Sequence, residues 1–405
     1  MSSTNPITLL YKLPHNCLKE ITKDCFQLTL PVQSHICPSC QTPTSKIHSY
    51  RNQKVKSAIF YTCGQTLVYR KRRYICSHCG KVFAENNTFI SRYQRMTQNT
   101  IKQIISEHSN ITSSSDIARR YGVSTPTVQR LFKFVNPSSM LLSEVISIDE
   151  FKGNTGAKFQ VVINDLEKRQ CLNILQDRAL DNLYKDISKY PLKERLKVKH
   201  VSIDLSSFFR KVVTICFPNA TIAADKFHTA RLANDALDEV RKRIQKSLPD
   251  EQRKYFKKSR YLMLSREKNL NEEDRLALQI ILNYSDELSA AYAMKEVFFN
   301  MLDSKNSTIF SKCFRQFQEA VEKQNRKEFN RVLKTTRQWK KEILHGIVTG
   351  FNNGFTEGCN TTIKNLKRIC YGYRNFDNFK RRILFLLNSP DRKKRRLIST
   401  QKIST

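Results

Sequence analysis

Three acidic residues stand at points in the chain from which their side chains could meet around metal ions. Asp149 follows the apolar run 145–148, Asp204 follows the run 200–203, and Glu357 opens an amphipathic basic helix. Carboxylates at strand ends and a helix start can bind two Mg²⁺ ions, which activate a water or a 3′-hydroxyl and stabilise the leaving oxygen of a phosphodiester. These residue types therefore predict metal-assisted chemistry on nucleic acid.

A second cluster follows the next apolar run. Asp225 and His228 would come together on a turn that enters a helix, where they could orient the scissile phosphate or the metal-binding carboxylates. The alternative interpretation is a helix-capping Asp beside a partly buried His. Glu150 and Asp165 compete for the role of first carboxylate, but Glu150 points to the opposite face from its neighbour if the strand continues.

The elements that must position these residues follow an α/β pattern. Apolar runs predict strands near 145–149, 158–164, 170–176, 199–204 and 220–225, and helices near 180–190, 205–216 and 227–247. With Asp149 on the first strand and Asp204 on the fourth, this order matches a ribonuclease-H-like sheet, in which the first and fourth strands are neighbours. Residues 248–345 contain no glycine and are predicted to be almost wholly helical, as is 355–390.

Two Cys-x-x-Cys pairs, Cys37 with Cys40 and Cys76 with Cys79, stand on either side of residues 41–75. Such pairs on tight turns, brought together by a hairpin, suit a tetrahedral Zn²⁺ with four thiolate ligands. The alternative is two unrelated pairs in a reduced core. The possible substitute ligands are Cys63, His35, His48 and His78.

Residues 113–131 have the parts of a helix-turn-helix. Ser113 and Asp116 suit the cap of a first helix, Gly122 allows the tight turn, and Ser124 and Pro126 suit the start of a second helix. Four side chains are then predicted to face outward, where they could contact base edges in the major groove: Thr127, Gln129, Arg130 and Lys133. An ordinary helical hairpin is the alternative.

The composition favours a nucleic-acid partner. The 405 residues include 71 Lys and Arg against 36 Asp and Glu, a net charge of +35, and 40% are apolar, enough for real cores. This excess predicts salt-dependent binding to polyanions. Basic residues gather in a predicted β-hairpin at 58–74, and Lys364, Lys367 and Arg368 form a stripe after Glu357 that would hold phosphate.

A membrane location is not expected. No window of about 18 apolar residues occurs, and the N-terminus lacks the pattern of a signal peptide. The twelve cysteines are therefore interpreted as reduced or metal-bound, in a cytosolic setting.

The predicted organisation is a multidomain α+β and α/β chain. A zinc-ribbon-like N-terminus and a helix-turn-helix precede a ribonuclease-H-like catalytic domain that an all-helical insertion interrupts. The predicted boundaries are 1–90 for the zinc-binding domain, 91–140 for the helix-turn-helix, 141–247 for the first catalytic part, 248–345 for the insertion, 346–390 for the last catalytic part and 391–405 for a basic tail.

The chain resembles the bacterial insertion-sequence transposases of the ISL-three group. The resemblance rests on the zinc and helix-turn-helix motifs in order and on these segments: Ile148-Asp149-Glu150-Phe151, Val201-Ser202-Ile203-Asp204-Leu205-Ser206, Phe217-Pro218-Asn219-Ala220, Asp225-Lys226-Phe227-His228, Thr356-Glu357-Gly358-Cys359-Asn360-Thr361-Thr362-Ile363-Lys364-Asn365-Leu366-Lys367-Arg368 and Tyr371-Gly372-Tyr373-Arg374-Asn375-Phe376. Two departures are Lys226, where the family more often has Arg, and Cys359-Asn360-Thr361, where it more often has paired Asn residues.

The resemblance implies a DDE transposase with Asp149, Asp204 and Glu357 as its triad. Such an enzyme binds the terminal inverted repeats of an insertion sequence and cuts and joins DNA with Mg²⁺ or Mn²⁺. The implied partners are double-stranded DNA, as transposon ends and target, and further copies of the chain in a homodimer or higher oligomer. The implied location is the bacterial cytoplasm, at the nucleoid.

Two other functions remain open from the sequence. One is a non-catalytic, sequence-specific DNA-binding regulator derived from a transposase, which would not need all three carboxylates. The other is a zinc-ribbon RNA-binding protein, which the helix-turn-helix disfavours.

Overall fold

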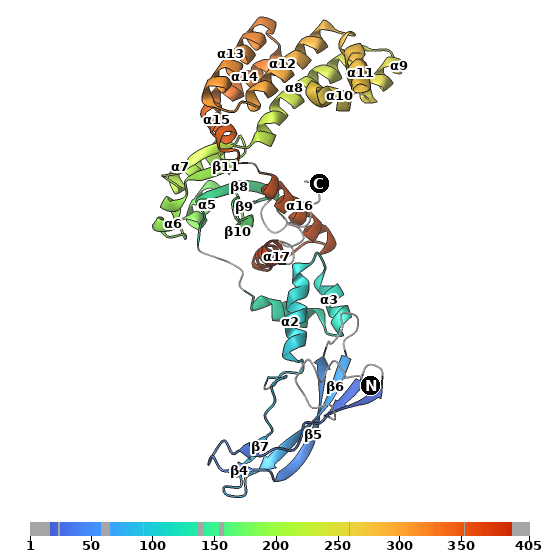
Figure 1. Cartoon of the computed structure of the whole chain (residues 1–405), viewed down its shortest axis with the longest axis vertical. Helices are drawn as coiled ribbons and strands as arrows, with labels where there is room; N and C mark the ends of the chain where they lie inside the picture. Colours follow the sequence, from blue (N-terminus) through green and yellow to red (C-terminus); the bar gives the residue numbers. More distant parts are fainter. Residues whose placement is uncertain are drawn as a thin grey trace. The chain divides into compact units, whose positions relative to one another are not determined.

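The computed structural model describes residues 17–22, 25–57, 65–91, 93–135, 141–153, 158–258, 260–351 and 353–390. Figure 1 labels the helices and strands of the chain. The chain divides into two compact units. Unit 1 comprises residues 1–137 and 363–405, and unit 2 comprises residues 138–362. The basic tail and Cys63 lie outside the described residues.

A five-stranded sheet forms the N-terminal part of unit 1. It contains β1 (Leu18–Thr22), β2 (Cys25–Leu28), β5 (Ile47–Ser57), β6 (Gln65–Ile75) and β7 (Val82–Ala84), in the order β1-β2-β6-β5 with β7 beside β6. Two short strands, β3 (His35–Ile36) and β4 (Pro43–Thr44), pair with each other.

The hairpin between the cysteine pairs begins earlier than predicted. Its first strand is β5, which is largely polar and pairs with β6 from Ile47↔Tyr74 to Ser57↔Gln65. The prediction for 58–74 was therefore wrong about where the hairpin starts, because β5 offers few apolar residues by which to recognise it. The part of the prediction at 58–64 lies outside the described residues.

Short helices complete unit 1. They are α2 (Gln98–Ser106), the 3₁₀ turn η2 (Glu107–Ser109), α3 (Ser114–Tyr121), α4 (Thr125–Lys133) and, from the end of the chain, α17 (Phe376–Asn388). A small core of Ile104, Ile117, Ala118, Tyr121 and Val128 holds α2, α3 and α4 together.

Unit 2 contains a second five-stranded sheet. Its strands are β8 (Val145–Lys152), β9 (Phe159–Asp165), β10 (Gln170–Leu175), β11 (His200–Ile203) and β12 (Thr221–Ala224), in the order β10-β9-β8-β11-β12. The first three strands are antiparallel, whereas β8, β11 and β12 run parallel. The predicted adjacency of the first and fourth strands is confirmed.

Helices follow and connect these strands. Near the sheet they are α5 (Leu180–Ile187), α6 (Leu192–Lys197) and α7 (Ser207–Cys216). Helix α8 (Lys226–Ser247) follows β12. The segment 248–345, predicted to be almost wholly helical, contains α9 (Asp250–Lys258), α10 (Arg260–Leu264), η3 (Glu267–Asn269), α11 (Glu272–Leu282), α12 (Asp286–Leu302), α13 (Ser307–Gln324), α14 (Lys327–Gln338) and the start of α15 (Lys340–Thr349). One hydrophobic core runs from the sheet into these helices.

Helix α15 returns the chain to the sheet at close range. A Cβ atom added to Gly346 would lie only 2.5 Å from the carbonyl oxygen of Ala224, the last residue of β12. Glycine therefore allows the helix backbone to approach the strand. Helix α16 (Gly354–Ile369) follows.

Candidate active site

A row of buried polar side chains crosses the middle of the unit 2 sheet. Ser147 on β8 is the direct cross-strand partner of Asn164 on β9 and of Ser202 on β11. The Thr356 hydroxyl lies 2.7 Å from that of Ser147 and accepts a 3.2 Å hydrogen bond from Asn164, while Ser202 donates to Asn353 at 2.9 Å. The start of α16 is thereby attached to this face of three strands.

Asp149 and Asp204 lie on the same face as these serines. Each follows its serine by two residues, and side chains alternate along a strand. Asp149 is only 8% exposed. Its two oxygens accept hydrogen bonds of 2.8 Å, one from the Glu150 amide and one from the side chain of Asn360 on α16.

The position of Asp149 corrects one prediction. We expected it to close its strand, but β8 continues to Lys152 because β9 stays paired with it as far as Phe159. Asp204 does follow directly after the end of β11, as predicted.

These two carboxylates have no nearby arginine or lysine partner among the contacts of the described residues. Burial raises the pKa of Asp149. Burial, followed by the charge of Asp149, raises the pKa of Asp204 to about 6. The Asp204 Oδ1 atom is buried without a hydrogen-bond partner in the described part of the chain. Hard oxygen ligands with unbalanced negative charge fit a divalent cation such as Mg²⁺.

Asp225 and His228 form a pair at the neighbouring strand end. Asp225 is 1% exposed and caps α8 by accepting from the amides of Phe227 and His228. The ring Nδ1 of His228 lies 2.7 Å from Asp225 Oδ2. This hydrogen bond raises the pKa of His228, and the charges of Asp225, Asp149 and Asp204 add to the effect. Asp225 thus caps a helix and also pairs with His228, whose pKa is raised by the charges of Asp149 and Asp204.

Glu357 lies in the first turn of α16 and is half-buried. Thr356 beside it and Asn360 one turn later contact the sheet, so the helix segment that carries Glu357 is fixed on the face of Asp149. Within the described residues, no hydrogen bond or ion pair joins the Glu357 carboxylate to Asp149 or Asp204, and the three do not form a close metal-binding group.

The two competing acidic residues have other partners. Glu150 forms a 2.5 Å ion pair with Arg178. Asp165 accepts hydrogen bonds from the Ser143 hydroxyl and from the Lys168 amide, the latter at 2.8 Å. Both therefore have local structural roles.

The structure brings the four predicted zinc ligands together in unit 1. The sulfur atoms of Cys37, Cys40, Cys76 and Cys79 all lie within 4.8 Å of one another. Cys37 and Cys79 are 3.6 Å apart, and Cys40 and Cys76 are 3.4 Å apart. Zn–S bonds of about 2.3 Å in a tetrahedron require sulfur separations of about 3.8 Å, so the cluster fits Zn²⁺.

Local turns explain this arrangement. Gln41 and Gly80, both at positive φ, donate backbone hydrogen bonds to the carbonyls of Cys37 and Cys76, which closes each knuckle. Hydrogen bonding with Thr42 lowers the pKa of Cys40 to about 5, which favours the thiolate that a metal requires. His35, a possible substitute, instead packs its ring against Tyr74.

The predicted helix-turn-helix is present as α3 and α4. Ser113 caps α3 by accepting from the Asp116 amide, and Gly122 adopts φ +59 at the turn. Ser124 precedes α4, with Pro126 in its first turn. Of the four predicted contact residues, three are exposed: Gln129, Arg130 and Lys133. Thr127 is half-buried, and its hydroxyl lies 2.9 Å from that of Ser124.

Arg382 on α17 is a residue that sequence reasoning missed. It is 3% exposed and donates hydrogen bonds to the carbonyls of His108, Asn110 and Thr112, the last two at 2.9 Å. These carbonyls belong to the turn that enters α3. The C-terminal helix therefore supports the helix-turn-helix.

Comparison with known protein families identifies the chain. A family model described as a transposase matches residues 146–383, more than half of the chain. The chain belongs to this transposase family. The helix-turn-helix domain of transposase family ISL3 matches residues 85–136, and the zinc-finger of transposase IS204/IS1001/IS1096/IS1165 matches residues 33–79. The order of zinc finger, helix-turn-helix and transposase domain is as predicted.

The transposase also has a curated relative. It is 25% identical over 356 residues to the transposase for insertion sequence element IS1001 from Bordetella parapertussis, across 85% of this chain and 86% of that protein. None of the described helices has the length and apolarity needed to cross a membrane.

Proposed function

We propose that this transposase binds the terminal inverted repeats of an insertion sequence and catalyses Mg²⁺-dependent DNA strand cleavage and strand transfer. The observation that carries this proposal is a pair of neighbouring carboxylates: Asp149 is buried on β8, and Asp204 is half-buried directly after the adjacent parallel strand β11. The helix that carries Glu357 is attached to the same face of the sheet. Because two element ends must be joined, we expect it to act on DNA as a homodimer or higher oligomer, at the bacterial nucleoid.

The topology supports a ribonuclease-H-like catalytic domain of the DDE type. The order β10-β9-β8-β11-β12 has three antiparallel strands followed by two parallel ones, with Asp149 on β8 and Asp204 directly after β11. On this interpretation, helices α9–α15 form an insertion between β12 and the helix of Glu357.

Each residue has a distinct part in the proposed site. Asp149, Asp204 and Glu357 would hold Mg²⁺ or Mn²⁺, which activates the attacking hydroxyl and stabilises the leaving oxygen. Asn360 orients Asp149 through its 2.8 Å hydrogen bond. Asp225 holds His228 with its cationic form favoured, where it can orient a scissile phosphate.

Incubation of the purified protein with Mg²⁺ and duplex element ends, scored for strand-specific nicks, tests this proposal. Asp149→Asn, Asp204→Asn and Glu357→Gln should each reduce cleavage to background while end binding persists, because each removes one metal-binding charge and keeps the shape. Asp286→Asn, at an exposed position in the first turn of α12, is the matched control. A wild-type protein that binds ends but never nicks them would favour the regulator instead.

The same assay tests the assignment of the second carboxylate. If Asp225→Asn abolished cleavage and Asp204→Asn did not, Asp225 would replace Asp204 in the triad. Near wild-type cleavage by any of the three triad variants would remove that residue from it.

DNA recognition divides, on this proposal, between two helices. Arg130, with Thr127, Gln129 and Lys133, would contact bases from α4, whereas Lys364, Lys367 and Arg368 would hold phosphate from α16. Arg130→Ala should cost about 1–3 kcal/mol on element ends and less on random DNA. Lys364→Ala should weaken binding to both DNAs equally, and equal losses for both variants on both DNAs would contradict the division.

We further propose that the four thiolates hold one Zn²⁺ that is structural. Such sites contribute on the order of 10 kcal/mol to the folding of small modules. Cys37→Ser or Cys79→Ser should therefore release the metal and expose the N-terminal sheet to protease while unit 2 remains folded. Unchanged protease resistance in metal-free protein would count against this role.

A further inference from the structure

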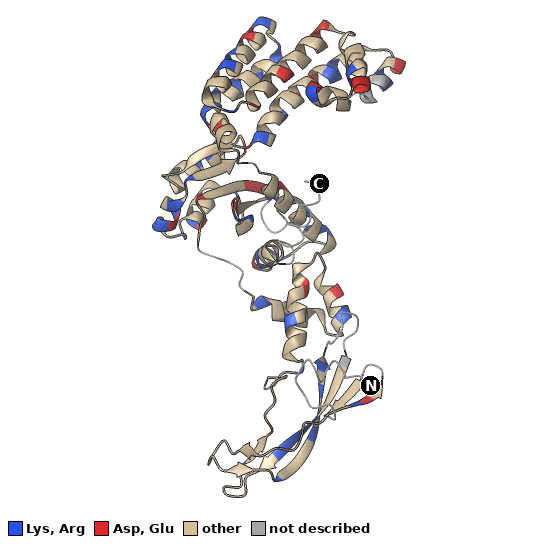
Figure 2. Ribbon diagram, viewed as in Figure 1, with Lys and Arg blue, Asp and Glu red and all other residues tan. Residues whose placement is uncertain are grey.

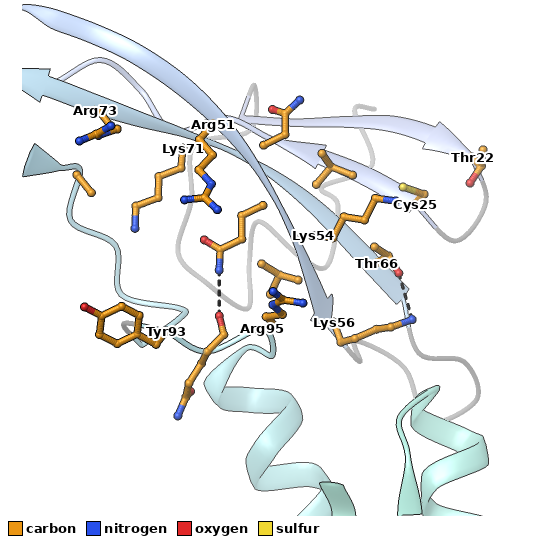
Figure 3. Close-up of a pocket in the computed structure, with 16 residues that line it drawn as sticks. Thr22, Cys25, Arg51, Lys54, Lys56, Thr66, Lys71, Arg73, Tyr93 and Arg95 are labelled. Carbon is orange, nitrogen blue, oxygen red and sulfur yellow. Dashed lines mark hydrogen bonds between the residues drawn. The ribbon is translucent and has the colours of Figure 1, made fainter.

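A basic groove lies in unit 1, outside both the zinc knuckles and α4, the second helix of the helix-turn-helix. It runs between the β5–β6 hairpin and residues 93–95 and has a volume of about 1300 Å³ (Figure 3). Six of its lining residues are cationic: Arg51, Lys54, Lys56, Lys71, Arg73 and Arg95. None of the described residues that line it is acidic.

The cations of this groove are arranged at an energetic cost. Arg51 is the direct cross-strand partner of Lys71, and like charges in that position repel. Arg73 lies two residues further along β6, on the same face. None of the three forms an ion pair within the described residues. Arg72, by contrast, is 5% exposed and bonds to Glu85 on the other face, so the hairpin can neutralise an arginine where it is structural.

The opposite wall of the groove is firmly attached and leads to the helix-turn-helix. The Lys56 amide donates to the Arg95 carbonyl at 2.9 Å, and the Gln53 side chain donates to the Gln94 carbonyl at 2.9 Å. A Cβ atom at Gly122, in the turn between α3 and α4, would lie 3.5 Å from Lys56 Nζ. The groove therefore reaches the turn of the DNA-reading motif.

We propose that this groove binds the sugar–phosphate backbone of double-stranded DNA beside the segment that α4 contacts. This deepens the proposed function and rests on it. The volume exceeds the range of about 300–1,000 Å³ typical of small-molecule pockets, and charged rather than apolar side chains dominate the lining. A polyanion would relieve the repulsion between Arg51 and Lys71. Contact through charge alone is independent of base sequence.

The test compares two double variants of the full-length, zinc-loaded protein. Arg51→Gln with Lys71→Gln removes two charges from the groove. Lys312→Gln with Arg315→Gln removes two exposed charges from α13 and serves as the control. Affinity is measured on a random-sequence duplex and an element-end duplex between about 50 and 200 mM salt. Zinc content and circular dichroism verify that both variants are folded.

The groove variant should reduce the slope of log K against log[salt] by about 2 on both duplexes, since each phosphate contact contributes about 0.9. The control should leave the slope unchanged. If both variants reduced the slope equally, the change would reflect net charge alone, and the proposal would be overturned. A loss of affinity confined to the element-end duplex would also overturn it.

The outcomes separate this inference from the proposed function. If the groove variant kept the wild-type salt slope and cleaved normally, the groove would not be a DNA-binding site, and the transposase assignment would be unaffected. If the wild-type protein never cleaved element ends, the catalytic proposal would be contradicted. The salt slopes on random DNA would still test whether the groove binds DNA.

Discussion

Buried acidic residues occupy two regions of unit 2, and their surroundings differ. In the helical segment, Asp238 contacts Arg241 and Lys242 at 2.8 Å each. Burial alone would raise the pKa of Asp238, but the hydrogen bonds from Lys242 and Arg241 outweigh it and lower the pKa. Figure 2 shows the same interleaving of basic and acidic residues over helices α8–α14.

Near the centre of the sheet, the net shift in pKa has the opposite sign. Burial raises the pKa of both Asp149 and Asp204, and the nearby cationic group, His228, is already bonded to Asp225. The same unit thus balances its acidic residues where they hold helices together and leaves them unbalanced beside the polar row. This difference is what the proposed metal-binding role of Asp149 and Asp204 requires.

The largest expected contrast is in stability. Asp238→Ala should lower the free energy of unfolding of unit 2 by about 3 kcal/mol, because it leaves Arg241 buried without its partner. Asp204→Ala in metal-free buffer should lower it by no more than about 1 kcal/mol, since no partner is abandoned. Fluorescence of Trp339, the single tryptophan, buried in unit 2, reports the transition in denaturant. Equal losses of unfolding free energy in the two variants would show that the two regions do not differ in this respect.

A smaller contrast concerns pH. The pKa of Asp204 is raised to about 6, so the folded state binds this proton more tightly than the unfolded state. The contribution of this proton to the free energy of unfolding is fully present below the unfolded pKa of about 4. It is lost as pH rises through about 6, and the loss is on the order of 2 kcal/mol. Relative to Asp204→Asn, metal-free wild type should therefore lose stability between about pH 4 and pH 6.5.

Asp238→Asn is the control of opposite sign. Because the pKa of Asp238 is lowered, its contribution is present above the unfolded value and is lost as pH falls. The differences between wild type and the two variants should slope in opposite directions with pH. Parallel slopes would show that the two regions are electrostatically alike.

The smallest expected effect comes from Mg²⁺ itself. At ten times its dissociation constant, a ligand of the folded state adds about 1.4 kcal/mol to the free energy of unfolding. We expect this gain for wild type and for Asp238→Asn, and its absence in Asp149→Asn and Asp204→Asn, with Na⁺ at equal ionic strength as the control. A full gain in Asp204→Asn would mean that the ion binds elsewhere.

The sequence predicted the strands and helices that carry chemistry because their apolar runs are short, regular and local. Asp204, Asp225 and the four cysteines could be placed from those runs and from spacing. Ser147 and Ser202 each stand two residues before an Asp, and this repeated Ser-Ile-Asp pattern marks a polar face within buried strands. This pattern points to the face on which α16 lies.

Other features could not be predicted because they depend on distant contacts. The bond between Ser147 and Thr356 joins residues 209 positions apart, and those of Arg382 span a similar distance to the turn before α3. Strand β5 is stabilised by pairing with β6 rather than by an apolar face of its own, so its sequence pattern is weak. The basic groove likewise needs the register of that pairing before its cations can be seen to gather.

The close approach of α15 to β12 has a genetic consequence. Any side chain at Gly346 would meet the carbonyl oxygen of Ala224, the residue immediately before Asp225, and the strand end would have to shift. A screen for variants that no longer mobilise DNA should therefore return position 346 even for Gly346→Ala. On a map of inactivating mutations, a glycine that bears no chemical group would rank with the carboxylates.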